Sequence, residues 1–202
     1  MDELILFIVI LNPFAQILYL YELMTKLNPK EFLIVHFKAS LISFIIFAIF
    51  ALIGENFLMK QVFQVRLASL QIFGGLIMLF IAFKYIVEGP GSNILFQGKI
   101  SELAPNISLP FMVGPGTIWM AILIGRKNSF SMTLILIAIV LLGNFLFLNL
   151  YHQFQYRVGE KFNLIVSKYM AILMRINALF IGAIAIEMLV TGFENIAGKI
   201  NL

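Results

Sequence analysis

The 202-residue sequence contains no cysteine, which excludes disulfide bonds, thiolate nucleophiles and metal sites that use cysteine ligands. It is also poor in charge, because Asp, Glu, Lys and Arg together make up only 12% of the residues. Soluble globular domains carry about twice that share, so the low charge excludes a domain of that class. The apolar share of 61% likewise excludes a disordered chain, which lacks the apolar surface for a core.

Catalytic motifs are missing as well. The two histidines, His36 and His152, show no metal-ligand spacing, and the sequence has no H-E-x-x-H motif, nucleophile elbow or phosphate-binding loop. Its 14 basic residues are scattered between apolar runs, a pattern that is typical of loops beside a membrane rather than of a nucleic-acid surface. We therefore expect no enzyme, no metal, no cofactor and no nucleic-acid partner.

Long apolar runs dominate what is present. A membrane-spanning helix takes roughly 20 residues, and six runs of about this length follow one another along the chain. These predicted spans lie at residues 4–24, 32–53, 67–87, 104–124, 131–151 and 168–190. The sequence therefore predicts an all-α polytopic membrane protein with six transmembrane helices. An even number of spans puts both termini on one side. That side carries five basic residues and the opposite side carries nine, so the positive-inside rule predicts that both termini lie outside the cell.

Sequence landmarks recur at a nearly constant offset. Asn12-Pro13-Phe14 in the first span corresponds to Gly114-Pro115-Gly116 in the fourth, 102 residues later. Two further pairs keep the same order and nearly the same offset, namely Gly54–Phe57 with Gly159–Phe162 and Val87–Gly89 with Val190–Gly192. The recurrence predicts duplication of a three-span unit.

A duplicated three-span unit has a definite topology. Because three is odd, the second copy must enter the membrane from the opposite side, which gives a 3+3 inverted repeat, an architecture typical of secondary transporters. We expect one transmembrane domain over residues 1–202, with halves at 1–90 and 104–202 joined by a loop at 91–103. A duplication kept only for packing is the alternative interpretation.

The first and fourth spans each contain a helix breaker at the centre. Pro13 and Pro115 remove a backbone hydrogen bond and clash with the preceding turn, so we expect both spans to be broken into half-helices. Exposed amides at the new helix N-termini bind carboxylates, and the carbonyls before the breaks suit an ammonium group. The candidate binding residues are Asn12, Pro13, Phe14, Gln16, Gly114, Pro115, Gly116 and Thr117. Two ordinary proline kinks are the alternative.

Other polar and small residues in the spans have simpler interpretations. Buried amide side chains favour hydrogen bonds between helices, and those expected to form them are Gln71, Asn144, Asn149 and Asn177. Small residues form stripes for close helix packing, with Gly74, Gly75 and Ala82 on the third span and Ala178, Gly182 and Ala185 on the sixth. Snorkelling to the membrane surface is the first interpretation of Arg175 and Glu187; a proton or cation site at Glu187 is the second.

The motifs resemble those of a known family. Leu11–Phe14 is similar to an N/D-P element of the MarC family of inner-membrane proteins, and Ser108–Ile118 is similar to its P-x-x-x-G-P-G-A-I element. Gly54-Glu55, Gly74-Gly75, Gly159-Glu160 and Ala185–Met188 also match, whereas Gln16, Gln71, Thr117 and Glu187 depart from the common residues. The family includes the SnatA small neutral amino-acid transporter, so the resemblance implies the six-span fold, a prokaryotic inner membrane and amino-acid transport.

These observations together predict a secondary transporter of a small polar metabolite, most suitably a neutral amino acid, held between the two breaks. The expected partners are membrane lipid, the substrate, H+ or Na+ as a coupling ion, and a second copy of the chain in a homo-oligomer. A non-transporting membrane scaffold, or a subunit of an assembly, is the alternative function.

Overall fold

The computed structural model describes residues 2–54, 64, 66–88, 103–158 and 160–198. Within these ranges all regular secondary structure is helical, as the sequence predicts. The elements in chain order are α1 (Asp2–Leu11), α2 (Pro13–Lys26), α3 (Pro29–Ile53), α4 (Leu67–Glu88), α5 (Leu103–Ile107), the wide helical turn η3 (Ser108–Met112), α6 (Pro115–Lys127), α7 (Phe130–Val158) and α8 (Glu160–Ala197). Most of the predicted loop at 91–103 and of the landmark at 54–57 lies outside the described residues, as does Gly159.

Four helical segments are long and apolar enough to cross a membrane. They are Pro29–Ile53, Ala68–Val87, Phe130–Val158 and Arg175–Ala197. Large apolar side chains such as Phe80, Leu142 and Phe180 are more than half exposed on these segments. Apolar surface this extensive is suited to contact with lipid rather than water, so the chain is an integral membrane protein. The assignment of six spans stays a prediction.

Helix starts follow from local capping. The Asn28 side chain accepts hydrogen bonds from the first-turn amides, including that of Glu31, whose carboxylate in turn accepts from the Asn28 amide at 3.0 Å. This capping box, with Pro29 at the first helical position, begins α3 after only two connecting residues, Leu27 and Asn28. Asn128 occupies the matching connection between α6 and α7, where its side chain donates to the Ile124 carbonyl at 3.0 Å. The two asparagines are a corresponding pair that sequence analysis missed.

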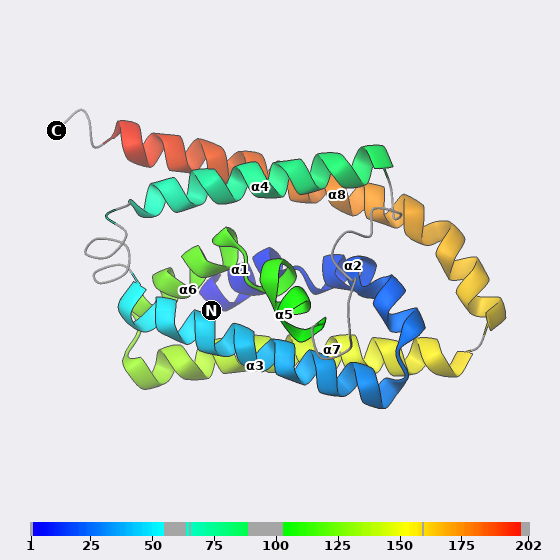
Figure 1. Ribbon diagram of the computed structural model, residues 1–202. Coiled ribbons are helices and arrows are strands. Elements are labelled where there is room, and N and C mark those ends of the chain that lie inside the picture. The colour runs from blue at the N-terminus through cyan, green and yellow to red at the C-terminus, as the bar shows by residue number, and fades with distance from the viewer. Residues whose placement is uncertain (1, 55–63, 65, 89–102, 159, 199–202) are drawn as a thin grey trace.

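Helices from the two halves of the chain pack against each other. Figure 1 shows α4 lying beside α8 and α3 lying beside α7, each pair running in opposite directions, with α1, α2, α5 and α6 between the pairs. α3 packs on α6 and α7, α4 packs on α6 and α8, and α1 and α2 pack on α7. Most of the core therefore lies between helices that precede the 89–102 connection and helices that follow it.

The predicted small-residue stripes on α4 and α8 are confirmed as a packing interface. Ala82, Ala178 and Ala185 are almost fully buried. A Cβ on Gly75 would lie 2.8 Å from the Ala185 carbonyl oxygen, and one on Gly182 would lie 3.6 Å from the Ala82 Cβ. The absence of larger side chains is what lets the two helices approach so closely.

The last two long helices extend beyond their predicted ends. The prediction of 131–151 becomes Phe130–Val158, and that of 168–190 becomes a helix that continues to Ala197. Hydropathy marks only the part of a helix that suits hydrocarbon, whereas a helix can continue with polar residues beyond it. The extension changes the position of Glu187, which lies ten residues from the end of α8 rather than one turn from it.

Gly125 provides a test of how α6 packs on α3. A Cβ at Gly125 would overlap the carbonyl oxygen of Ala51, so α6 would have to move away from the α3 backbone. We expect Gly125→Ala to lower the free energy of unfolding by about 1–3 kcal/mol, the usual cost of overpacking, measured as a lower melting temperature in detergent.

Gly143→Ala in α7 is the matched control. No atom lies within 4 Å of a Cβ at Gly143, and alanine favours a helix over glycine, so this variant should melt at the same temperature or higher. Equal melting temperatures for the two variants would contradict the close packing of α6 on α3.

Candidate functional site

The helical path is interrupted between α1 and α2. Asn12 has the left-handed backbone conformation, with φ 48° and ψ 72°, and α2 begins immediately afterwards at Pro13. Its side-chain oxygen accepts a hydrogen bond from the Ala15 amide at 3.0 Å, and its carbonyl accepts from the Gln16 amide at 3.1 Å. Asparagine tolerates this conformation and is a preferred N-cap, so the local sequence explains why the path breaks here.

A second interruption precedes α6. Leu109 within η3 has an extended backbone, with φ −114° and ψ 118°, and Val113 after it is also non-helical. Gly114 is extended as well, and Pro115 begins α6. The Thr117 hydroxyl accepts a hydrogen bond from the Gly114 amide at 2.8 Å, while Gly114 itself has no side chain to accept from the first-turn amides.

The carbonyls before both interruptions are hydrogen-bonded by side chains that follow them. The Gln16 Nε2 donates to the Leu11 carbonyl at 2.8 Å. The Thr117 Oγ1 lies 3.0 Å from the Met112 carbonyl and 2.9 Å from the Gly114 carbonyl, and donates its single proton to one of them. Gln16 and Thr117 are both buried. Both side chains therefore hold the interruptions together, a role that differs from the predicted contact with a substrate.

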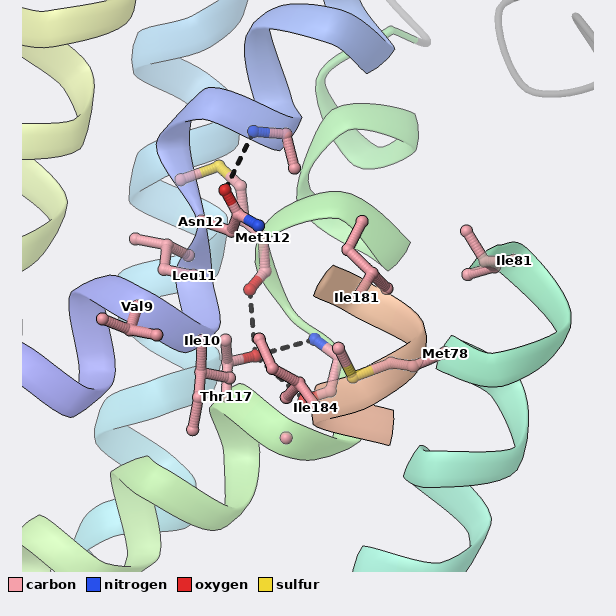
Figure 2. A pocket seen from close by; sticks show the side chains of 13 residues that line it. Val9, Ile10, Leu11, Asn12, Met78, Ile81, Met112, Thr117, Ile181 and Ile184 are labelled. Atoms are coloured by element: carbon pink, nitrogen blue, oxygen red, sulfur yellow. Dashed lines mark hydrogen bonds between the residues drawn. The ribbon is translucent and has the colours of Figure 1, made fainter. Parts of the chain in front are cut away.

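A small cavity of about 80 Å³ lies between the two interruptions. Figure 2 shows Asn12 and Thr117 reaching it from the two breaks, with α4 and α8 forming the far wall. Four of the eight predicted binding residues line it, namely Asn12, Gly114, Gly116 and Thr117. The structure thus brings the two sequence motifs to one place.

The other four predicted residues do not line this cavity. Phe14 is 67% exposed, and its ring meets that of Phe147 edge-on at 5.3 Å. Pro13 and Pro115 begin their helices, and Gln16 bonds to Leu11.

Sequence reasoning missed most of the wall. The further lining residues are Val9, Ile10, Leu11, Ala15, Met78, Ile81, Met112, Ile181 and Ile184. On α4 and α8 the lining residues are three apart, a spacing that puts side chains on one helix face, and they lie close to the small-residue stripes. The stripes were the one signal that could have located this wall.

The cavity has an electropositive side. Pro115 has no amide hydrogen, and the first-turn amides of Gly116 and Thr117 have no intrahelical partner. Among the described residues, no other group accepts a hydrogen bond from these two amides. Partial positive charge at the N-terminus of α6 therefore adjoins the cavity, where it favours an anionic group such as a carboxylate.

Each interruption is held by helices from the other half of the chain. Asn12 donates to Asn177 of α8 at 3.4 Å, and Asn144 of α7 donates to the Gln16 side-chain oxygen at 3.1 Å. In the other direction, Ser43 of α3 bonds to Ser108 of η3 at 2.8 Å. A Cβ on Gly74 of α4 would overlap the Pro115 ring, so α4 and the second interruption are also in close contact.

The predicted interhelical roles of the buried amides are confirmed. Asn144 and Asn177 bond to the first interruption as described, and Asn195 of α8 donates to Gln71 of α4 at 3.3 Å. Asn149 of α7 donates to His36 of α3 at 3.0 Å. All four residues thus connect different helices.

The two histidines have structural partners on neighbouring helices. The His152 Nε2 of α7 donates to the Met24 carbonyl, near the end of α2, at 2.9 Å. The Phe32 ring lies against both imidazoles, with centroid distances of 5.4 Å to His36 and 4.6 Å to His152. They hold α2 and α3 against α7.

Comparison with known proteins identifies similar sequences along the whole chain. The pattern of a family described as MarC family integral membrane protein matches residues 1–197. A UPF0056 membrane protein of Pyrococcus horikoshii is 26% identical, over 95% of this chain and 92% of the relative. One of Aquifex aeolicus is also 26% identical, over 93% of this chain and 88% of the relative. No solved structure gives a significant match.

The backbone conformation of Asn12 can be tested against an ordinary cap. Asn28 caps α3 with a negative φ of −73°, so Asn28→Ala should cost about 1 kcal/mol and Asn28→Gly only a few tenths. Asn12→Ala loses its cap and also forces alanine into the left-handed region, so we expect a cost of about 2–3 kcal/mol. Asn12→Gly should cost far less, since glycine adopts that region freely.

Unfolding in detergent would measure the four free energies. The difference in unfolding free energy between the Ala and Gly variants should be larger at position 12 than at position 28. Equal differences would contradict the left-handed conformation of Asn12.

Proposed function

The chain belongs to the MarC family of integral membrane proteins, and from this premise we propose that it is a secondary transporter of a small polar metabolite, most suitably a neutral amino acid. The substrate binds in the cavity between the two helix interruptions. The single observation that carries the proposal is that residues from both interruptions line one cavity, although they are about 100 positions apart in the sequence.

The helix arrangement supports a six-span inverted repeat with interrupted first and fourth spans. Residues 2–26 and 103–127 each extend for about 37 Å at the rise of a helix, enough to cross a hydrocarbon layer of about 30 Å. In Figure 1 the segment formed by α1 and α2 runs opposite to that formed by α5, η3 and α6. The proposed halves are residues 1–90 and 104–202, each contributing one interrupted and two continuous spans.

The chemistry of the cavity supports the substrate class. Its volume of about 80 Å³ is roughly half that of a cavity of about 150 Å³ that binds benzene, so only a small solute fits. The amides of Gly116 and Thr117 suit a carboxylate. The side-chain oxygen of Asn12 and the Leu11 carbonyl suit an ammonium group, because each has a second lone pair beside the hydrogen bond that it already accepts.

Cellular placement follows from the same proposal. We propose that both termini lie outside, because the excess of basic residues on the opposite side favours the cytoplasm there, and that the membrane is a prokaryotic inner membrane, as the family resemblance implies. Transport requires no chemical conversion of the substrate, so we propose no enzymatic activity and no cofactor. Lipid covers the exposed apolar helix faces, and a second copy of the chain is a proposed partner.

A membrane scaffold without transport activity is the second candidate function. It is favoured by the side-chain hydrogen bonds that Gln16 and Thr117 make to their own interruptions, because interruptions stabilised in this way can serve packing alone. A scaffold needs no access of solute to the cavity, so a change confined to the cavity wall separates the two functions.

Gly116 is the position for this test. A Cβ there would lie 3.2 Å from the Ile10 Cγ2 and 3.3 Å from the Met188 Sδ, and both are side-chain atoms that can shift. Gly116→Ala should therefore fold, while its methyl group reduces a cavity of about 80 Å³. In proteoliposomes we expect exchange of labelled alanine and serine to fall about tenfold, the order of effect for one misplaced methyl group in a pocket, and exchange of glycine to fall less.

The control variant is Gly143→Ala, which lies away from the cavity and should exchange all three amino acids as the wild type does. Undiminished alanine exchange by Gly116→Ala would contradict the binding site. If the folded wild-type protein exchanges none of the small neutral amino acids, the transport proposal fails and the scaffold function is favoured.

A further inference from the structure

Glu187 lies deep within a membrane-length segment. The segment runs from Arg175 to Ala197, so Glu187 is about 15 Å along the helix axis from its C-terminal end. Because α8 continues with polar residues such as Glu194 and Asn195, this distance is an upper bound on the depth of the carboxyl group in the hydrocarbon layer, and the Glu187 side chain is exposed. Within the described part of the chain, no ion pair involves its carboxylate. An ionised carboxylate in this position is costly unless water or a proton reaches it.

A crevice of about 280 Å³ passes beside Glu187. It is lined by Gln71 of α4, Trp119 of α6 and Thr191 of α8, and by apolar residues of α1 and α8. Glu187 is the only lining residue with an ionisable side chain, and it is exposed, as is the next acidic residue on α8, Glu194, two turns further on. No charged group on α1, α4 or α6 therefore lines the crevice beside this carboxyl group.

The crevice adjoins the proposed substrate cavity. Val9, Ile10 and Ile184 line both, so these apolar side chains separate the carboxyl group from the substrate. Towards the end of α8, Thr191 and Asn195 continue at helical spacing on the same face as Glu187. Glu187 is thus the innermost polar residue of a stripe that begins near the end of α8 and stops beside the cavity.

We propose that Glu187 is the proton-binding site that couples substrate movement to a proton gradient, a role that rests on the proposed transport function. The carboxylate takes up one proton from one side of the membrane, crosses the conformational change as a neutral acid, and releases the proton on the other side. The ionised form needs water in the crevice, so closing the crevice around it is disfavoured until the proton binds.

The oxygen groups of the crevice favour a proton over sodium. A metal cation requires several oxygen ligands at once, and among the described residues that line this crevice only Glu187, Gln71 and Thr191 carry side-chain oxygens. One carboxylate is sufficient for a proton.

The test compares two kinds of alanine transport in proteoliposomes. For one proton per alanine, a gradient of one pH unit supports up to about tenfold accumulation, which the wild-type protein should approach. Glu187→Gln keeps the size of the side chain but cannot titrate, so it should exchange alanine at the wild-type rate and show no accumulation. Glu194→Gln is the matched control on the same helix and should accumulate alanine as the wild type does. A sodium gradient at equal pH should drive no accumulation.

The outcomes separate the inference from the proposal beneath it. Retained exchange in Glu187→Gln also shows that this variant folds. Wild-type accumulation by Glu187→Gln, or accumulation driven by sodium instead of protons, overturns the role of Glu187 while leaving transport intact. Absence of any exchange by the wild-type protein overturns the transport function and this inference with it.

Discussion

Hydrogen bonding of the backbone in a medium without water is the constraint on which this structure depends. A continuous helix satisfies its own amides and carbonyls, but each interruption leaves several of them without a partner. The chain meets this requirement with side chains placed just after each interruption. Asn12 supplies a cap and tolerates the left-handed conformation, while Gln16 and Thr117 donate back to the preceding carbonyls. The interruptions can therefore lie inside the protein without being filled by bulky residues, which leaves a cavity between them.

The same constraint explains why the two ends of the chain are interleaved. The first interruption bonds to α7 and α8, and the second contacts α3 and α4. Interhelical hydrogen bonds in membranes are weak, averaging about 0.6 kcal/mol, so a small set of them can exchange without unfolding the helices. Under the proposed function, movement of the two interrupted segments against the long α3–α7 and α4–α8 pairs replaces these bonds, while the pairs themselves stay intact.

The sequence predicted features that depend on local residue patterns. The helix breakers, the small-residue stripes and the interhelical amides are of this kind. Proline interrupts a helix, small residues allow close packing and buried amides form hydrogen bonds, whichever helices they contact. It did not predict that Gln16 and Thr117 bond to carbonyls of their own interruptions, since that depends on backbone angles which periodicity does not encode. Nor did hydropathy predict the full length of α8, because a helix continues where polar residues begin.

The two sides of the cavity differ, and under the proposed function this difference orients the bound amino acid. On the α2 side, the side-chain and backbone oxygens of Asn12 already accept hydrogen bonds from the amides of Ala15 and Gln16, so that side presents oxygen atoms. On the α6 side, the glycine cap has no side chain to accept from the first-turn amides, so those of Gly116 and Thr117 stay available. An amino acid carries one anionic and one cationic group, and this polarity places its carboxylate towards α6. Its side chain then meets the apolar wall of α4 and α8, and the small volume restricts that side chain to a few atoms. Under the proposed function, substrate charge and substrate size are thus selected by different helices.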